Sequence, residues 1–225
     1  WCWPVRLLKE KMTIQYCTNC VLPSCKPVTA KEGKKVTASA TNTINFQDGV
    51  CEACRWNVIK ENTIDWEARE TKLEKLLNRY RSSDGSYDVI VPASGGKDSV
   101  YVSHILKHKY GMTPLTVTWA PSLWTEQGRR NQENLVKSGF DNILISPNGE
   151  IHRVLTKLAF KKLGHPFQPF IFGQRSVGPK MALKHNVGLV FYGENVAEYG
   201  NPLEENYNPQ MDVNLFTTYN IKDRK

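Results

Sequence analysis

No apolar run in the 225 residues approaches the roughly 20 residues that a helix needs to cross a bilayer, which argues against a membrane-spanning segment. Residues 1–11 do not form a signal peptide either, because their apolar part is short and charged residues follow it at once. We expect this segment to be a leader or an expression remnant, with Met12 as a native start. We also expect the protein to be cytoplasmic.

Acidic residues are fewer than basic ones: 22 Asp and Glu stand against 30 Lys and Arg, which gives a net charge of +8. Such a balance suits nucleic acid, nucleotides or phosphorylated substrates. The basic residues are spread along the chain rather than gathered in one block, so the charge is weak evidence for any of these partners. The length and the hydrophobic content of 40% allow one large domain, or one domain with a small attachment.

Cysteine is absent after Cys54, and four of the six cysteines form two C-x-x-C pairs, Cys17 with Cys20 and Cys51 with Cys54. One pair can place two thiolates on a tetrahedral metal ion, and two pairs complete a Cys₄ site. We therefore predict a zinc-ribbon-like module over residues 12–62, with structural zinc favoured over free, disulfide-bonded or redox-active thiols. An iron–sulfur cluster at the same four residues stays open.

A Walker A loop is missing as well. The glycine-rich stretch Ser94-Gly95-Gly96-Lys97-Asp98-Ser99 lacks the first glycine of that motif and has an aspartate after its lysine. An apolar strand at 87–91 precedes the stretch and a helical pattern over 98–110 follows it. Two adjacent glycines let a ligand approach the backbone closely, and the free N–H groups and dipole of a helix start attract anions. The stretch therefore predicts a phosphate-binding turn rather than a mere connection.

Apolar strands alternate with helical patterns along the rest of the chain. An amphipathic helix is predicted over 63–81, strands over 87–91, 115–119, 142–146 and 188–192, and later helices over 151–163 and 174–185. This alternation predicts an α/β fold, a parallel sheet with helices on both faces. Ligands of such sheets bind beyond the carboxyl ends of the strands. Ser94–Ser99, the segment after Trp119 and Gly193-Glu194-Asn195 should therefore surround one cleft.

The stretch Ser94–Ser99 resembles the S-G-G-x-D-S loop of the PP-loop ATP pyrophosphatases, which split ATP into AMP and pyrophosphate. Several further stretches, in the same order along the chain, resemble the N-acetyl sugar amidotransferases of bacterial surface-polysaccharide and nonulosonic acid pathways. These stretches are Cys17-x-x-Cys20-Val-Leu-Pro, Asp48-Gly49-Val50-Cys51-x-x-Cys54-Arg55, Asp65-Trp66, Val91-Pro-Ala-Ser-Gly-Gly-Lys-Asp-Ser99, Glu126-x-Gly128-Arg129-Arg130-Asn131-x-x-Asn134-Leu135 and Tyr192-Gly193-Glu194-Asn195.

The resemblance implies the HUP-like pyrophosphatase fold over residues 87–205, joined to the cysteine module by a connecting helix within 63–86. Family members are longer than this chain, so part of the C-terminal end of the domain is expected to be missing. Residues 206–225 stay unassigned.

The resemblance also implies a reaction. ATP would adenylate the acetamido group of an N-acetylated sugar or sugar nucleotide, and ammonia would displace AMP to leave an acetamidino group. A separate glutaminase subunit would supply the ammonia. ATP, magnesium and structural zinc are the expected cofactors, and nucleic acid is not an expected partner.

Chemistry suggests a role for each residue type around the predicted cleft. Backbone N–H groups of Gly95, Gly96 and Lys97, with the hydroxyls of Ser94 and Ser99, would hold the phosphates. Lys97 would also neutralise charge on the departing pyrophosphate, and Asp98 would coordinate magnesium or orient the attacked group.

Six further residues complete the predicted site. Trp119 would flank the adenine, and Glu194 is a candidate metal or amide contact. Arg129 and Arg130 would bind an anionic group of the substrate, since guanidinium matches carboxylate or phosphate; an ordinary solvated helix start explains these arginines equally well. Asn131 and Asn195 are predicted as further substrate contacts.

Two rival functions stay open. An RNA-modifying enzyme of the same superfamily, such as a tRNA thiolase or a lysidine-type synthetase, would suit the cysteine module and the basic charge. Thiolases of this kind usually carry cysteines inside the pyrophosphatase domain, whereas here none follows Cys54. A non-catalytic, zinc-containing binding module is the second rival.

Overall fold

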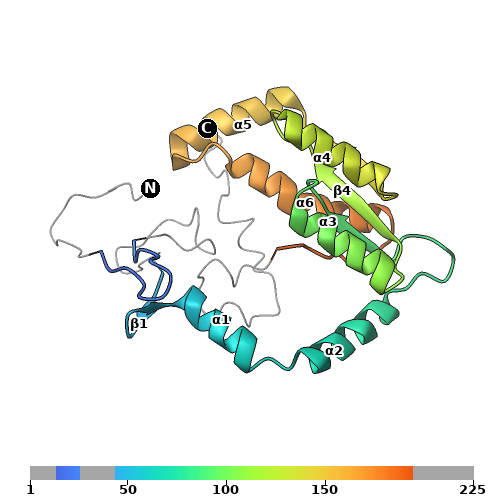
Figure 1. Cartoon of the computed structure of the whole chain (residues 1–225). Coiled ribbons are helices and arrows are strands. Elements are labelled where there is room, and N and C mark those ends of the chain that lie inside the picture. Colours follow the sequence, from blue (N-terminus) through green and yellow to red (C-terminus); the bar gives the residue numbers. More distant parts are fainter. Residues whose placement is uncertain (1–13, 26–43, 195–225) are drawn as a thin grey trace. The chain divides into compact units, whose positions relative to one another are not determined.

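The computed structural model describes residues 14–25 and 44–194 (Figure 1). The chain divides into two compact units: the first contains the residues up to Asp65, and the second spans Trp66–Glu194. The predicted leader (1–11) and the unassigned tail (206–225) lie outside the described residues, as does Asn195. Within the described ranges, no helix is long and apolar enough to cross a membrane.

The first unit contains a short hairpin and one helix. β1 (Phe46–Gln47) pairs antiparallel with β2 (Val50–Cys51). Asp48 and Gly49 turn the chain between them with φ angles of 52° and 77°, a conformation that aspartate tolerates and glycine adopts freely. α1 (Glu52–Asn62) begins directly after β2, inside the segment that the sequence assigned to the cysteine module.

The second unit is built on a parallel sheet in the order β3-β4-β5. Its strands are β3 (Val89–Pro92), β4 (Pro114–Trp119) and β5 (Asp141–Ile145). The fourth predicted strand is present as a single parallel bridge, in which Val190 lies beside Ile90 on the free edge of β3. Backbone N–H groups of Ile90 and Phe191 donate across this edge to carbonyls at 2.9 Å each. The predicted parallel sheet is confirmed.

Six helical segments of the second unit connect or cover these strands (Figure 1). They are α2 (Trp66–Arg79), α3 (Lys97–His104), the π-helical turn η2 (Ile105–Lys109), α4 (Glu126–Lys137), α5 (Gly149–Leu163) and α6 (Gln168–Lys184).

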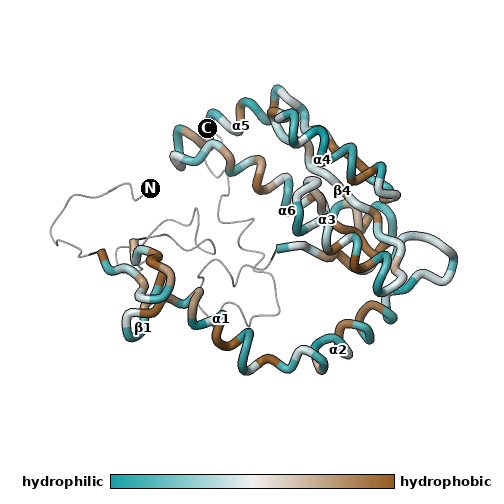
Figure 2. Tube along the Cα trace, in the orientation of Figure 1, coloured by the Kyte–Doolittle hydropathy of each residue, from teal (hydrophilic) through white to brown (hydrophobic). Residues whose placement is uncertain are grey.

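Both faces of the sheet are covered, as the sequence predicts. Side chains alternate across a strand, so Val89 and Val91 point to one face and Ile90 to the other. The two valines pack in a cluster with Leu77 of α2 and Leu106 of η2. Ile90 packs in a second cluster with α6 residues that include Val177. Figure 2 shows apolar stretches alternating with polar ones along the helices, the pattern of helices that each bury one face.

Two predicted helix boundaries are wrong. The helix expected over 63–81 begins only at Trp66, and the preceding residues Thr63–Asp65 separate it from α1. The helix expected from residue 174 begins at Gln168, so the Pro- and Phe-rich break is shorter than predicted. Gly164, with a φ of 68°, ends α5, and α6 then accepts a proline in its first turn, where a missing N–H costs no hydrogen bond.

Candidate functional site

The glycine-rich turn lies between the end of β3 and the start of α3. Gly96 is the N-cap of α3 with extended backbone angles of φ −74° and ψ 160°, and no side chain caps the helix. The N–H groups of the first helical turn have no intrahelical acceptor, so without a capping side chain they are available to an anion. The hydroxyl of Ser99 turns back and donates to the Gly96 carbonyl at 3.2 Å. The predicted local geometry of strand, turn and helix start is confirmed.

α4 packs directly against this turn. Gly95 has a φ of 76°, and a Cβ atom added to it would lie 2.9 Å from the carbonyl carbon of Asn131 and 3.0 Å from the backbone nitrogen of Gln132. Real Cβ atoms do not approach backbone so closely. Only glycine therefore fits between the loop and α4 without displacing one of them.

The segment after Val190 lies against the first turn of α3. A Cβ atom added to Gly193 would lie 2.8 Å from the carbonyl carbon of Asp98 and 2.9 Å from the backbone nitrogen of Ser99. This contact brings the exposed Glu194 beside the loop, as the sequence predicts for the two segments.

The topology places the loop where ligands of open α/β sheets commonly bind. From β3 the chain moves to β4 and β5 on one side, and it later returns to the other side of β3 with Val190. The order of the strands thus reverses between β3 and the Val190 segment. The carboxyl ends of strands beside such a reversal are a usual ligand position, and Ser94–Ser99 and Gly193-Glu194 follow those strand ends.

The two charged residues of the loop face solvent. The Lys97 Nζ and the Asp98 Oδ1 lie 3.5 Å apart, and the two side chains are 92% and 57% exposed. An ion pair this exposed contributes little to stability. Both side chains can therefore turn toward a bound ligand at small cost to the fold; their catalytic roles stay predictions.

Trp119 is the last residue of β4, at the carboxyl ends of the strands, but its indole packs on α6. A Cβ atom added to Gly173 would lie 2.2 Å from the ring, so the ring rests directly on the glycine backbone. The buried indole Nε1 has no hydrogen-bond partner. The predicted contact of Trp119 with adenine stays a prediction.

α4 carries the predicted substrate residues, which fall into two groups. Arg129 and Arg130 are exposed, and Arg130 pairs with Glu126 one turn earlier at 3.2 Å. Asn131 instead lies against Gly95, and its Oδ1 accepts a hydrogen bond from Gln127 at 2.7 Å. The structure thus brings Asn131 into contact with the loop.

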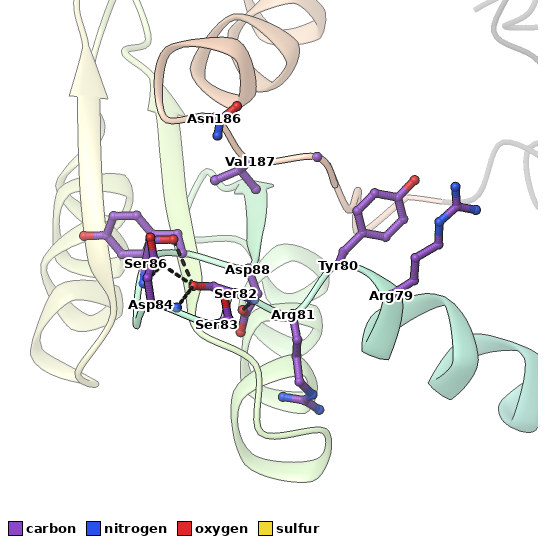
Figure 3. A pocket seen from close by; sticks show the side chains of 12 residues that line it. Arg79, Tyr80, Arg81, Ser82, Ser83, Asp84, Ser86, Asp88, Asn186 and Val187 are labelled. Atoms are coloured by element: carbon purple, nitrogen blue, oxygen red, sulfur yellow. Dashed lines mark hydrogen bonds between the residues drawn. The ribbon is translucent and has the colours of Figure 1, made fainter.

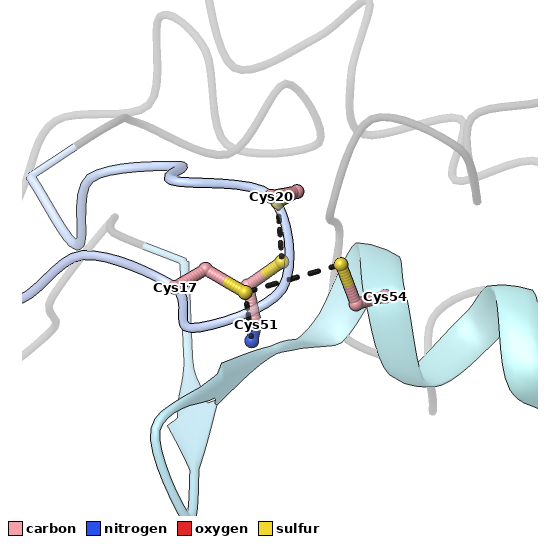
Figure 4. A group of neighbouring side chains, drawn as sticks. All are labelled: Cys17, Cys20, Cys51 and Cys54. Atoms are coloured by element: carbon pink, nitrogen blue, oxygen red, sulfur yellow. Dashed lines mark hydrogen bonds between the residues drawn. The ribbon is translucent and has the colours of Figure 1, made fainter.

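The four predicted metal-binding cysteines come together in the first unit (Figure 4). Their Sγ atoms all lie within 4.8 Å of one another. The Cys17–Cys54 and Cys20–Cys51 sulfur distances are 3.9 Å and 3.6 Å. Four thiolates at 2.3 Å from one zinc ion would be separated by about 3.8 Å along each tetrahedral edge. The donor set and its spacing therefore fit zinc.

The protonation of these thiols depends on their crowding. Burial raises the pKa of the Cys17 thiol, but backbone N–H groups of Cys51, Asn19 and Cys20 outweigh it and lower that pKa to about 6. Burial and then the neighbouring thiols raise the pKa of Cys54. Thiolates this close repel one another, so a full set of four requires a cation to compensate their charge.

Few apolar residues are buried in the described part of the first unit (14–25 and 44–65). They are Cys17, Ile44, Cys51 and Trp56, two of which are metal-site candidates. Small domains with few buried apolar residues commonly depend on a metal.

A polar hollow of about 320 Å³ lies at the amino-terminal end of β3 (Figure 3). Its lining precedes β3 and the Val190 segment: Arg79–Asp84, Ser86–Asp88 and Asn186–Gly188. Asp88 is buried there, and its carboxylate accepts from the backbone N–H groups of Ser82 and Thr113 at 2.6 Å each. These bonds tie the chain before β3 in place, so the arrangement has a structural explanation.

Sequence reasoning missed Gln132, whose backbone supports Gly95 and whose side chain enters a polar network with the sheet. One signal was present: Thr116, Thr118 and Asn142 are polar residues inside strands of an otherwise apolar sheet. Buried polar residues need hydrogen-bond partners, and a polar side chain on a helix packed against the sheet can supply them.

No family model matches the chain. An uncharacterized protein of Methanocaldococcus jannaschii is 26% identical over 102 residues, which are 45% of this chain and 36% of that protein. The chain thus spans about a third of the length of this curated relative. A solved structure, the NH3-dependent NAD synthetase from Campylobacter jejuni in complex with the nitrate ion, is 14% identical and covers 56% of each chain with a TM-score of 0.40.

Proposed function

We propose that the chain binds ATP at the Ser94–Ser99 loop and uses it, with release of AMP and pyrophosphate, to convert an acetamido group of an N-acetylated sugar into an acetamidino group. ATP binding is supported by the start of α3, which no side chain caps. A turn that only glycine fits leads into this helix, and the order of the strands reverses beside it. The sugar rests on the resemblance of the separate motifs to the N-acetyl sugar amidotransferases.

The proposed chemistry needs two steps, because an amide oxygen is a poor leaving group. The acetamido oxygen attacks the α-phosphorus of ATP, a new O–P bond forms, and the bond to the bridging oxygen breaks to release pyrophosphate. Ammonia then attacks the activated carbon, the C–N bond forms, and the C–O bond breaks to release AMP. Loss of a proton from the added nitrogen leaves the amidine.

The loop residues serve the first step. Backbone N–H groups of Gly95, Gly96 and Lys97 hold the phosphates, with Ser94 and Ser99 beside them. Lys97, which is 92% exposed, swings onto the departing pyrophosphate, and Asp98 holds magnesium against the phosphate oxygens. Asn131 supports the loop, because its backbone and Cβ lie against Gly95, and it stays a proposed substrate contact.

The remaining residues serve the acceptor and the ammonia. Glu194 follows the glycine that contacts α3, and in this proposal its carboxylate orients the amide or a metal ion. Arg129 and Arg130 extend from the exposed side of α4 and bind an anionic group of the sugar. A separate glutaminase supplies the ammonia in the cytoplasm, and Cys17, Cys20, Cys51 and Cys54 hold a structural zinc ion.

The test is an analysis of nucleotide products. Purified protein is incubated with ATP, magnesium, ammonium chloride and a UDP-linked N-acetyl sugar, and the products are separated by ion-exchange chromatography. AMP and pyrophosphate formed only with the sugar support the proposal, and mass spectrometry of the sugar should show the oxygen replaced by an NH group. Formation of ADP would refute it.

Two further arms separate the rival functions. Replacing the sugar with tRNA tests the RNA-modifying enzyme, which tRNA-dependent AMP release would support. Exchange of labelled pyrophosphate into ATP tests whether adenylation occurs at all. No exchange with sugar or tRNA would favour the non-catalytic binding module.

A further inference from the structure

A hydrogen-bonded group of four polar side chains joins β4, β5 and α4. We call Thr116, Thr118, Gln132 and Asn142 the Gln132 network. The Gln132 Nε2 donates to the Asn142 Oδ1 at 2.7 Å. The Asn142 Nδ2 donates to the hydroxyl oxygens of Thr116 at 2.9 Å and Thr118 at 3.0 Å.

The Gln132 network is closed and largely buried. Thr116 and Thr118 are 0% and 2% exposed. The Thr118 hydroxyl donates to the Gln132 Oε1 at 3.4 Å, and the Thr116 hydroxyl donates to the backbone carbonyl of Asp141 at 2.6 Å. Because each side chain is bonded to another member, the arrangement carries no desolvation penalty for an unpaired group.

Gln132 is the link between this network and the anion-binding turn. Its side chain is bonded to β5 through Asn142, and its backbone nitrogen is one of the atoms on which Gly95 rests. A Cβ atom added to Gly95 would lie 3.0 Å from that nitrogen, so the loop backbone and the helix backbone are in direct contact. A shift of α4 along the sheet would therefore move the backbone against which the loop packs.

Apolar side chains would hold α4 on the sheet equally well but would not fix its position along it. Hydrophobic contacts are non-directional, and related packings differ little in energy. A buried hydrogen-bond network has one arrangement that satisfies all its members, which is why such groups specify register. Leu135 of α4 already supplies a buried apolar contact, so adhesion of the helix does not require the polar group.

From these contacts we infer that the Gln132 network is a positioning device for the nucleotide loop. Gln132 and Asn142 do not touch the nucleotide. They fix the α4 backbone so that Gly95 keeps its left-handed conformation and the N–H groups of Gly96 and Lys97 stay aligned for phosphate. The inference rests on the proposed function for its ligand, but the effect on the loop is expected in the free protein as well.

The first variant is Asn142→Leu, which keeps the approximate volume and removes the amide that joins three partners. The matched control is Val187→Ala, a buried core residue before the Val190 segment, at the other edge of the sheet. Both variants should lower the thermal unfolding midpoint. Only Asn142→Leu should weaken binding of a non-hydrolysable ATP analogue, measured by calorimetry, by about tenfold, the effect of one lost net hydrogen bond.

The second variant separates positioning from stability. Asn142→Leu combined with Gln132→Met and Thr118→Val replaces both amides, and the buried hydroxyl that bonds to them, with apolar groups of similar size. Removing these members together leaves no unpaired polar group among them, so the unfolding midpoint should recover toward that of the wild type. Affinity for the analogue should stay low, because the register of α4 is no longer fixed. Affinity that recovers together with stability would overturn the inference.

Amide NMR signals make the test independent of the proposed ligand. In the free protein, the ¹⁵N–¹H signals of Gly95 and Gly96 should move or broaden in Asn142→Leu but not in Val187→Ala. Wild-type protein that fails to bind the analogue would refute the proposed function while these signals still test the network. Unchanged Gly95 and Gly96 signals would overturn the inference itself. Thr118→Val, which removes a single hydroxyl, serves for the same measurements if Asn142→Leu does not fold.

Discussion

Replacing Gly95 with alanine should damage the loop far more than the same change at Gly85. Both glycines have left-handed φ angles, 76° and 80°. Alanine in that region costs about 1 kcal/mol at either position. Gly85 has nothing within 4 Å of an added Cβ, so this strain is its whole cost, whereas at Gly95 the new atom would meet α4 backbone at 2.9 Å and 3.0 Å. Gly85→Ala is therefore a matched control for the contact.

The contact adds a second cost at Gly95. Overpacking of this kind costs roughly 1–3 kcal/mol when the surroundings cannot relax, and backbone atoms of a helix yield less than a side-chain tip does. We expect Gly85→Ala to lose about 1 kcal/mol of unfolding free energy and Gly95→Ala about 2–4 kcal/mol. If the loop relieves the clash by moving instead, the loss of stability is smaller and the loss of ATP affinity larger.

Urea unfolding and calorimetric titration with ATP measure the two quantities on the same samples. Gly95→Ala should reduce ATP affinity at least tenfold, equivalent to about 1.4 kcal/mol, and Gly85→Ala should leave affinity unchanged. Equal losses of stability in the two variants, with equal ATP affinity, would refute the reasoning, because the contact between the loop and α4 would then have no energetic consequence.

Three further predictions concern the side chains of the candidate site. Asp98→Ala should abolish AMP formation while circular dichroism and the unfolding midpoint stay unchanged, because the carboxylate is 57% exposed and paired only loosely with Lys97; retained turnover would reject its role. Arg130→Ala should raise the KM for the sugar without changing that for ATP, and an equal change in both would contradict its assignment to the sugar. Elemental analysis should find about one zinc per chain, and Cys17→Ser should reduce it; iron, or no metal, would overturn the zinc assignment.

The same cysteine site predicts a dependence on pH. The pKa of Cys17 is lowered to about 6, so its thiolate is present above that pH and is protonated as the pH falls through it. Protons compete with a metal for thiolates, so metal binding should weaken as the pH falls below about 6 and be restored on return to neutral pH. Metal content measured after dialysis across this range tests the sign; release at high rather than low pH would contradict it.

The spacing of apolar residues predicted where the helices lie better than it predicted which of their side chains are buried. Residues 151–163 do form most of α5, but Ile151 and Val154 on its apolar side are 60% and 63% exposed, whereas Ala159 is 8% exposed. A repeat of apolar residues identifies a face, and it does not say what packs against that face. The break predicted before residue 174 was too long for a related reason, because two prolines suggested a loop while one of them occupies the permissive first turn of α6.

The local sequence by itself determined the turn at residues 94–99, the alternation of strands and helices that gives a parallel sheet, and the grouping of the four cysteines in one site. Each depends on neighbouring residues: glycines that permit the turn, β-branched residues that favour the strand, and thiols spaced for one ion. Tertiary structure alone decided that Gly193 rests on the first turn of α3, that Trp119 packs on Gly173, and that Gln132 connects the loop to the sheet. These contacts join segments tens of residues apart, and their distances depend on how helices settle on the sheet, which local residue preferences do not encode.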